Sequence, residues 1–328
     1  MTEQDLVDQL DAAVQALLAR PESAPPAAPP ELADLAGLAA DLRELPRDDF
    51  RARLKSDLER KATMTTTAVK PKPVRAGLQT ITPYLAVREA EQLIEFVKQA
   101  FEAQGRVLGV GSAGGLHAEF EIGETMVMIG GGSKWRGTPR PASLHFYVRD
   151  ADAVYQRALA AGAHSLYAPM DQPYGDREGG VEDLCGNQWF IATHKATGLA
   201  PEGFRSGVTP GLRVQGAPQL LELLKQAFAA EEVSRTQTPD GTLIHGEMRI
   251  GDSIIELGEA HGRWQPITAM LHLYVDDADA WYGRAMAAGA TSLQSPADQP
   301  YGARAAAVAD PFGNEWWFSM PLKGAGRG

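Results

Sequence analysis

The sequence predicts an α+β protein in which one module is written twice in tandem. Two observations carry this prediction. Short motifs recur at a nearly constant offset along the last three quarters of the chain, and each copy reads as a β-α-β-β-β pattern followed by the same pattern again. Antiparallel strands with one helix in each unit are typical of the α+β class, so we expect four such units after an N-terminal segment.

Repeated motifs fix the offset between the copies. Leu144-His145-x-Tyr147-Val148 recurs as Leu271-His272-x-Tyr274-Val275, and 272 − 145 = 127. His117-x-Glu119 recurs as His245-x-Glu247, and 245 − 117 = 128. Further pairs are Lys98–Phe101 with Lys225–Phe228, Asp171–Gly175 with Asp298–Gly302, and Gly186-Asn187 with Gly313-Asn314. So small a shift over so many matches indicates duplication.

The first copy shows the order of elements. Apolar periodicity and glycines predict a strand over 81–87, a helix over 89–103 and strands near 105–110, 115–122 and 125–130. The order then restarts with a strand over 143–148, a helix over 150–161 and strands near 164–169, 179–183 and 188–193. The second copy repeats this pattern.

The domain organisation follows from changes in composition. We expect a helical segment over 1–65 with a proline-rich break at Pro21–Pro30, a linker over 66–79, a first module over 80–200 and a second over 207–322. The helical segment shows no chemistry of its own. It is either a docking element for a partner or a loosely ordered appendage.

Charge and cysteine content limit the class of protein. The net charge is −11, which argues against a nucleic-acid partner because phosphate contacts need clustered Lys and Arg. Cys185 is the single cysteine, so no intrachain disulfide can form. With no secretory signal pattern at the N-terminus and no apolar run long enough to span a bilayer, we expect a cytoplasmic protein without a membrane partner.

Two motifs carry a resemblance to a known family. Tyr174-Gly-Asp-Arg177 and Asp183-x-x-Gly186-Asn187-x-Trp189 resemble the PhnB-like branch of the glyoxalase/bleomycin-resistance/dioxygenase (vicinal oxygen chelate, VOC) superfamily, over residues 80–194 and 207–321. The resemblance implies that two βαβββ units in each module form an open curled sheet around a cavity. Single-module relatives typically dimerise, so we expect modules 1 and 2 to pack as a pseudo-dimer within the chain.

The resemblance also implies where a divalent metal would bind. The family's ligands come from the first, fourth, fifth and eighth strands, and these positions map to Thr82, Met128, Ser143 and Phe190 in module 1 and to Thr209, Glu256, Met270 and Trp317 in module 2. Only Glu256 is a metal-ligand type, so we expect no metal in module 1 and no cofactor. The alternative is one divalent ion in module 2, because His272 and Glu315 stand two residues from mapped positions and share their strand face. His245 would be a further ligand. Those groups otherwise form a polar wall.

Alternation along the strands selects the side chains that face the cavities. The predicted ligand-binding residues are Tyr84, Met128, His145, Tyr147, Arg177, Phe190, Arg213, His272, Tyr274 and Trp317. Candidates for acid–base catalysis are His145, His272, His117 and His245, the last two beside Glu119 and Glu247 at i, i+2. The alternatives are that Met and aromatic side chains fill each barrel as core, and that Arg177 forms a structural salt bridge.

The pattern favours a small-molecule binding protein of the glyoxalase/bleomycin-resistance type, independent of metal, that takes up an amphipathic or aromatic ligand in its module cavities. The alternative is a divalent-metal-dependent lyase, isomerase or dioxygenase with its site in module 2. A third is an interaction protein that docks a partner through its N-terminal helices. Metal content separates the first two.

Overall fold

The computed structural model describes residues 78–195 and 206–322. The helical segment expected over 1–65 and nearly all of the expected linker lie outside these residues. The first copy contains β1 (Ile81–Val87), α4 (Ala90–Phe101), β2 (Gln104–Val110), β3 (Leu116–Ile122), β4 (Thr125–Gly131), β5 (Ser143–Tyr147), α5 (Ala151–Ala160), β6 (His164–Asp171), β7 (Asp176–Glu182) and β8 (Gln188–His194). These bounds agree with the expected elements to within three residues.

The second copy repeats this order. It contains β9 (Gly207–Val214), α6 (Ala217–Phe228), β10 (Glu231–Gln237), β11 (Leu243–Ile250), β12 (Ser253–Glu259), β13 (Met270–Tyr274), α7 (Ala278–Ala287), β14 (Thr291–Asp298), β15 (Ala303–Ala309) and β16 (Glu315–Pro321). The α+β class and the tandem modules are therefore confirmed.

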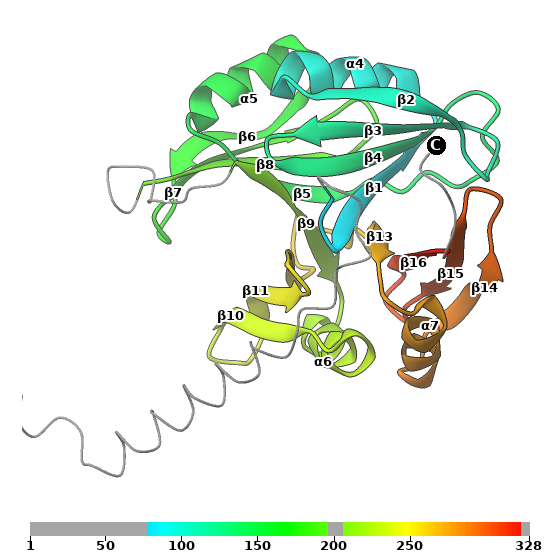
Figure 1. Ribbon diagram of the computed structural model, residues 1–328. Helices are drawn as coiled ribbons and strands as arrows, with labels where there is room; N and C mark the ends of the chain where they lie inside the picture. The colour runs from blue at the N-terminus through cyan, green and yellow to red at the C-terminus, as the bar shows by residue number, and fades with distance from the viewer. Residues whose placement is uncertain (1–77, 196–205, 323–328) are drawn as a thin grey trace, which may run out of the picture. The chain divides into compact units, whose positions relative to one another are not determined.

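The described strands form two eight-stranded sheets, and each sheet contains strands of both copies (Figure 1). One has the order β10-β11-β12-β9-β5-β8-β7-β6 and is here called the His145 sheet. The other has the order β14-β15-β16-β13-β1-β4-β3-β2 and is called the His272 sheet. Antiparallel pairing of β5 with β9 joins the copies in the first sheet, and pairing of β1 with β13 joins them in the second. The two copies form the expected intrachain pseudo-dimer.

The pairing corrects one expectation. Each cavity was expected to be built from the two units of one module, whereas each sheet joins the second unit of one copy to the first unit of the other. The repeated sequence does not determine which strand pairs with β5. Strands β1 and β9 are equivalent strands of the two copies, and either could pair with the free edge of β5. As a result, side chains about one hundred residues apart lie on one sheet face.

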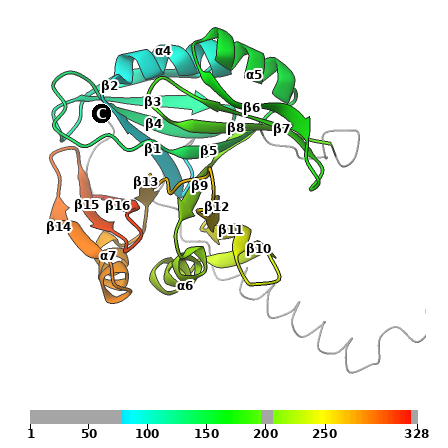
Figure 2. The ribbon, with the colours of Figure 1, turned by 180° about the vertical axis from the view of Figure 1, so that it is seen from behind.

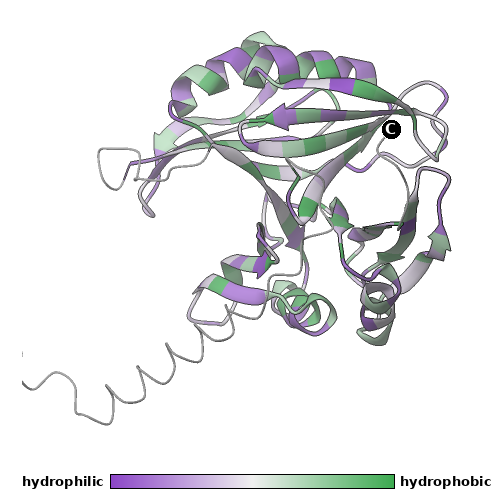
Figure 3. Cartoon of the chain, in the orientation of Figure 1, coloured by the Kyte–Doolittle hydropathy of each residue, from purple (hydrophilic) through white to green (hydrophobic). Residues whose placement is uncertain are grey.

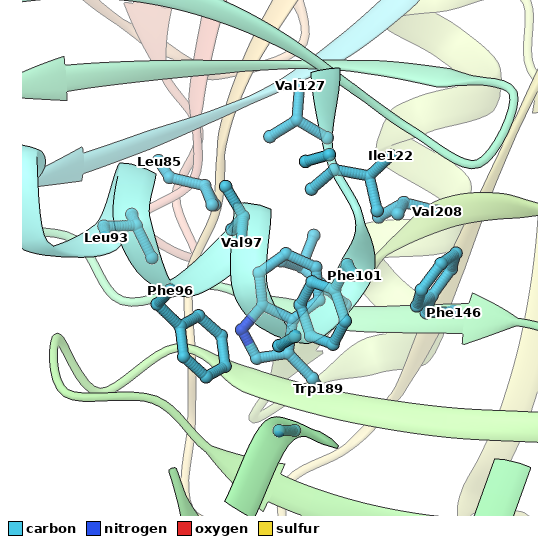
Figure 4. Packing of buried hydrophobic residues seen from close by; sticks show 14 of the residues in the cluster. Leu85, Leu93, Phe96, Val97, Phe101, Ile122, Val127, Phe146, Trp189 and Val208 are labelled. Atoms are coloured by element: carbon cyan, nitrogen blue, oxygen red, sulfur yellow. The ribbon is translucent and has the colours of Figure 1, made fainter. Parts of the chain in front are cut away.

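Each hydrophobic core, in contrast, is formed almost entirely by residues of one copy. Helices α4 and α5 lie side by side against strands of the first copy in both views (Figures 1 and 2). Between them Phe101 packs against Phe146 and Trp189, with ring centroids 5.3 and 4.6 Å apart (Figure 4). In the second copy Phe228 and Trp316 pack in the same way at 4.7 Å. The helices of a copy thus hold together two units that belong to different sheets.

The helices are amphipathic, with hydrophilic and hydrophobic residues alternating along α4 and α5 (Figure 3). Buried residues of α4 include Ala90, Leu93, Val97 and Phe101, which recur at the three- and four-residue spacing of one helical face. Asp150 caps the N-terminus of helix α5, and its side chain accepts a hydrogen bond from the Ala153 amide. Among the described helices, none has the length and apolar character needed to cross a bilayer.

The Asp183–Trp189 motif has a structural role. The carboxylate of Asp183 accepts hydrogen bonds from the Trp189 indole at 2.9 Å, from the Asn187 side chain and from two backbone amides. Asn187 in turn accepts from the amide of Ala142 just before β5. Burial raises the pKa of Asp183, although these donors oppose the shift. The same bonds recur around Asp310, so the motif holds the turn before β8 and its equivalent before β16.

The face of each sheet opposite the helices carries the polar side chains. Leu144 and Phe146 of β5 belong to the core beneath the helices, so strand alternation places His145 and Tyr147 on the other face. By the same rule Leu271 and Leu273 enter the second core and leave His272 on the opposite face of its sheet. These two surfaces are called the His145 face and the His272 face below.

Candidate ligand-binding site

A buried histidine lies between two carboxylates on the His145 face. Nδ1 of His145 lies 3.0 Å from Oε1 of Glu256, which comes from β12 of the second copy. Nε2 of His145 lies 3.1 Å from Oε2 of Glu178 on β7. This distance is that of an ion pair, although the two atoms are not aligned for a hydrogen bond. His145 is 9% exposed and Glu178 7% exposed. Both copies therefore contribute to one Glu–His–Glu cluster.

The carboxylates keep His145 protonated. Burial on its own lowers the pKa of the imidazole, but the charges and hydrogen bonds of Glu256 and Glu178 outweigh it and raise the pKa to about 10. Burial likewise favours the neutral form of Glu178, and the bond and charge of His145, with help from Tyr167, hold its pKa below the usual value. At neutral pH the cluster is one imidazolium between two carboxylates, with a net charge of −1.

Two tyrosines extend the cluster. Tyr167 donates a short hydrogen bond to Glu178. Tyr147 stacks on His145 with ring centroids 4.4 Å apart and donates to Oδ2 of Asp176 at 2.9 Å. The other oxygen of Asp176 lies 2.6 Å from Nδ1 of His194. These contacts fix the rings around His145, and burial, followed by the nearby carboxylates, raises the pKa of both tyrosines well above 10.

An aromatic patch lies beside the cluster. Trp264, from the loop after β12, meets Phe190 and Tyr167 edge to face with ring centroids 5.6 and 6.1 Å apart. The guanidinium groups of Arg213 and Arg263 lie 5.3 and 4.5 Å from the Trp264 ring. Arg213 also donates to Oε1 of Gln188 at 2.6 Å. All three rings are only partly buried, so they present ring surface next to the charged cluster.

The equivalent surface of the other sheet lacks both carboxylates of the cluster. The offset of the copies places Met128 where the His145 face has Glu256 (256 − 128 = 128) and Ala305 where it has Glu178 (305 − 178 = 127). Without these carboxylates, burial and the neighbouring His117 lower the pKa of His272 to about 4. Nδ1 of His117 lies 3.3 Å from the hydroxyl of Tyr84, whose pKa burial raises to about 12. His272 is neutral at physiological pH.

The positions that would hold a metal carry too few ligands. In the His145 sheet the mapped positions on the four central strands are Glu256, Thr209, Ser143 and Phe190, and only Glu256 is a usual metal ligand. Both oxygens of Glu256 already contact His145, which as an imidazolium cannot coordinate a metal. In the described ranges no group of three or more His, Cys, Asp or Glu is arranged to hold an ion. This donor set does not fit the divalent metal of the family.

The proposed three-residue metal site of module 2 is wrong. Glu256 lies on the His145 sheet, whereas His272 and Glu315 lie on β13 and β16 of the other sheet. Glu315 forms an ion pair with Arg140 at 2.7 Å. The expectation failed because it placed both units of one copy around one cavity.

The other predicted residues divide between the two faces. His145, Tyr147, Phe190 and Arg213 share the His145 face, and Tyr84, Met128, His272, Tyr274 and Trp317 the His272 face. His245 lies on β11 opposite Thr236. Arg177 forms the structural salt bridge instead of a ligand contact, with Nη2 2.6 Å from Asp152 and Nη1 3.2 Å from Asp171.

Burial and Asp183 raise the pKa of Cys185 to about 12, which makes it unreactive.

Three contributors to the site were missed, namely Glu178, Tyr167 and Trp264. Alternation along β7 indicates that Glu178 faces the same side as Asp176. Trp264 stands in a loop, where no periodicity applies. A cavity of about 500 Å³ lies elsewhere, on the helix side of the first copy between Phe101, Phe146 and Arg157, and does not include the cluster.

Comparisons with known proteins agree with the fold. Residues 208–318 match the model of the Glyoxalase/Bleomycin resistance protein/Dioxygenase superfamily. An uncharacterised protein of Mycobacterium bovis is 35% identical over 127 residues, which span 35% of this chain and 84% of the relative. The anthracycline biosynthesis protein DnrV of Streptomyces peucetius is 30% identical over 199 residues, 56% of this chain and 67% of DnrV.

A solved structure supports the same architecture over both copies. Glyoxalase I of Zea mays superposes with a TM-score of 0.57 at 13% identity, over 73% of this chain and 92% of the maize protein. At that identity the likeness concerns the fold alone. Together with the tandem βαβββ units and the family match, these relatives show that the chain belongs to the glyoxalase/bleomycin resistance protein/dioxygenase superfamily.

Proposed function

We propose that this protein binds a small planar aromatic molecule on the His145 face and needs no metal to do so. The observation that carries the proposal is the buried Glu256–His145–Glu178 cluster beside the ring surfaces of Trp264, Phe190 and Tyr167. An apolar, aromatic surface with a few fixed polar groups is the usual composition of a small-molecule site.

The protonation of His145 argues against the catalytic alternatives. A general base and a metal ligand both need a neutral imidazole nitrogen, whereas the pKa of His145 is raised to about 10 and both of its nitrogens face carboxylates. Burying two carboxylates and an imidazolium contributes little net stability. Such clusters are more common at functional sites, and here the cluster supplies fixed charge for recognition.

The aromatic patch favours a flat ligand. The three partly exposed rings form an aromatic surface, and Arg213 and Arg263, which lie over the Trp264 ring, add cations that favour π-systems. The name of the relative from Streptomyces peucetius assigns it to anthracycline biosynthesis, and anthracyclines are planar aromatic compounds. This likeness supports the aromatic class of ligand.

The test is a titration of the full chain, treated with a chelator, with the anthracycline doxorubicin, followed by protein fluorescence. We expect saturable binding that does not change when divalent metals are added. Trp264→Leu should weaken it at least about fivefold, since stacking on one aromatic ring contributes about 1 kcal/mol. Trp135→Leu, in the corresponding loop of the first copy, is the matched control and should bind normally.

Three outcomes would overturn the proposal. The first is the absence of binding to the wild-type chain. The second is binding that appears only after a divalent metal is supplied, which would favour a metal-dependent lyase, isomerase or dioxygenase. Equal loss in Trp264→Leu and Trp135→Leu would also count against it, because the ligand would then not be on the His145 face.

A further inference from the structure

We infer that the His272 face is a second binding site, for a neutral aromatic compound that carries a hydroxyl group, with Thr82 and His272 as its anchors. This inference goes beyond the proposed function, which concerns the His145 face only. It depends on different residues, on a different sheet.

Two buried polar atoms on this face have no hydrogen-bond partner within the described part of the chain. They are Oγ1 of Thr82 and Nε2 of His272. Thr82 is 1% exposed, and the two residues stand directly opposite each other on the antiparallel strands β1 and β13. Facing side chains in such a pair have Cβ atoms roughly 5 Å apart. Buried polar groups of native proteins are nearly always satisfied, so this adjacent pair calls for a partner.

The charges around the pair select a neutral partner. His272 lies in register with Thr82 on one side and Trp317 on the other, and Tyr84 lies in register with Met128. Burial and the nearby His117 keep His272 uncharged. The uncharged imidazole of His272 and the hydroxyl of Thr82 therefore offer a ligand hydrogen bonds and no fixed charge. Glu119, opposite Met128 on β3, is already engaged in an interaction of its own.

One hydroxyl group of a ligand can form hydrogen bonds with both Oγ1 of Thr82 and Nε2 of His272. A hydroxyl donates one hydrogen bond and accepts others, and the hydroxyl of Thr82 also does both. The neutral imidazole takes one role or the other, according to its tautomer. A phenol-like ligand therefore bridges the two atoms in either case, while its ring lies against the partly exposed rings of Tyr84 and Trp317. A ring without a hydroxyl leaves both atoms unpaired.

The experiment uses the full chain at pH 7 with three probes that share one ring system, namely 2-naphthol, naphthalene and 2-naphthoate. We expect 2-naphthol to bind most tightly. Thr82→Val keeps the shape of the side chain and removes its hydroxyl, so 2-naphthol should bind roughly three- to tenfold more weakly. Naphthalene binding should not change. Thr209→Val is the matched control, since Thr209 stands opposite His145 at the equivalent place on the other sheet.

Several outcomes would overturn the inference. If Thr82→Val raises the melting temperature while 2-naphthol binds as before, the unpaired atoms destabilise the fold and do not bind a ligand. If 2-naphthol binding is weakened by Glu256→Gln and not by Thr82→Val, the probe sits on the His145 face. His272→Phe provides a second variant, and unchanged 2-naphthol binding in that variant contradicts the inference as well. None of these results depends on whether doxorubicin binds on the His145 face, so the two proposals fail separately.

Discussion

His145 and His272 occupy the same position in the two copies and have opposite protonation states. The pKa of His145 is raised to about 10 by two carboxylates that outweigh its burial, whereas burial and His117 lower the pKa of His272 to about 4. The difference arises from two positions, where Glu256 and Glu178 on one face correspond to Met128 and Ala305 on the other. Because each sheet combines strands of both copies, the two carboxylates of the charged cluster come from different copies.

The first prediction concerns stability as a function of pH. His145 has a folded pKa of about 10, above the unfolded value near 6.5. Its contribution to the free energy of unfolding is therefore fully present below about pH 6.5 and is lost as the pH rises through about 10. His272 has a folded pKa of about 4, so stability is also lost as the pH falls from about 6.5 towards 4.

Urea unfolding measured from pH 4 to 10 checks this prediction. We expect maximum stability between these two losses, near pH 6.5. His272→Phe should remove part of the acid loss and leave the alkaline loss unchanged. A stability profile that is flat between pH 7 and 10 would contradict the assignment of His145.

The second prediction concerns the carboxylate from the second copy. Glu256→Gln keeps the shape of the side chain but leaves a buried imidazolium with one carboxylate, so the free energy of unfolding at pH 7 should fall by about 3 kcal/mol. This is the low end for breaking a buried pair, because the Glu256 side chain is 15% exposed. Met128→Leu, at the equivalent position without a charge partner, should cost less than about 1.5 kcal/mol. Equal effects of the two changes would show that the cluster has no special energetic role.

The third prediction tests the packing of one copy on the other. Gly251 has φ = +63°, and a Cβ there would lie 2.3 Å from Oγ1 of Thr80 in the first copy. Gly241 has φ = +87° with nothing within 4 Å of a Cβ. Both alanine variants incur the left-handed backbone penalty of about 1–2 kcal/mol, but only Gly251→Ala adds a clash. It should therefore lower the free energy of unfolding further than Gly241→Ala, by roughly 1–3 kcal/mol. If the two variants unfold alike, the contact between the copies is not as described.

The fold was predictable from sequence because its signals are local. Periodicity located the helix at Ala90–Phe101 and the strand at Ser143–Tyr147, and the repeat supplied the second copy. Alternation also placed His145 and Tyr147 on the face away from the core. The sequence does not show whether β5 pairs with β1 or with β9. That pairing determines which side chains are in contact.

The candidate site depended on that choice. Glu256 was recognised as a residue with ligand chemistry, but its partner was expected to be His272 of its own copy. The β5–β9 junction brings it to His145 instead, and it brings Trp264 to Phe190. The periodicity of a sequence does not show which side chains that are distant in the chain contact each other. The sequence therefore indicates the residue types of the site but not which of them pair.

The most direct test of this account is a titration of the two histidines by NMR in the intact chain, with His145→Gln and His272→Gln used to assign the ring signals. We expect His145 to remain protonated from pH 5 to 9, with a pKa of about 10, and His272 to remain neutral down to a pKa of about 4. In Glu256→Gln the pKa of His145 should fall while that of His272 stays the same. Two histidines that titrate together near the ordinary pKa of 6.5 would contradict the proposed difference between the two faces.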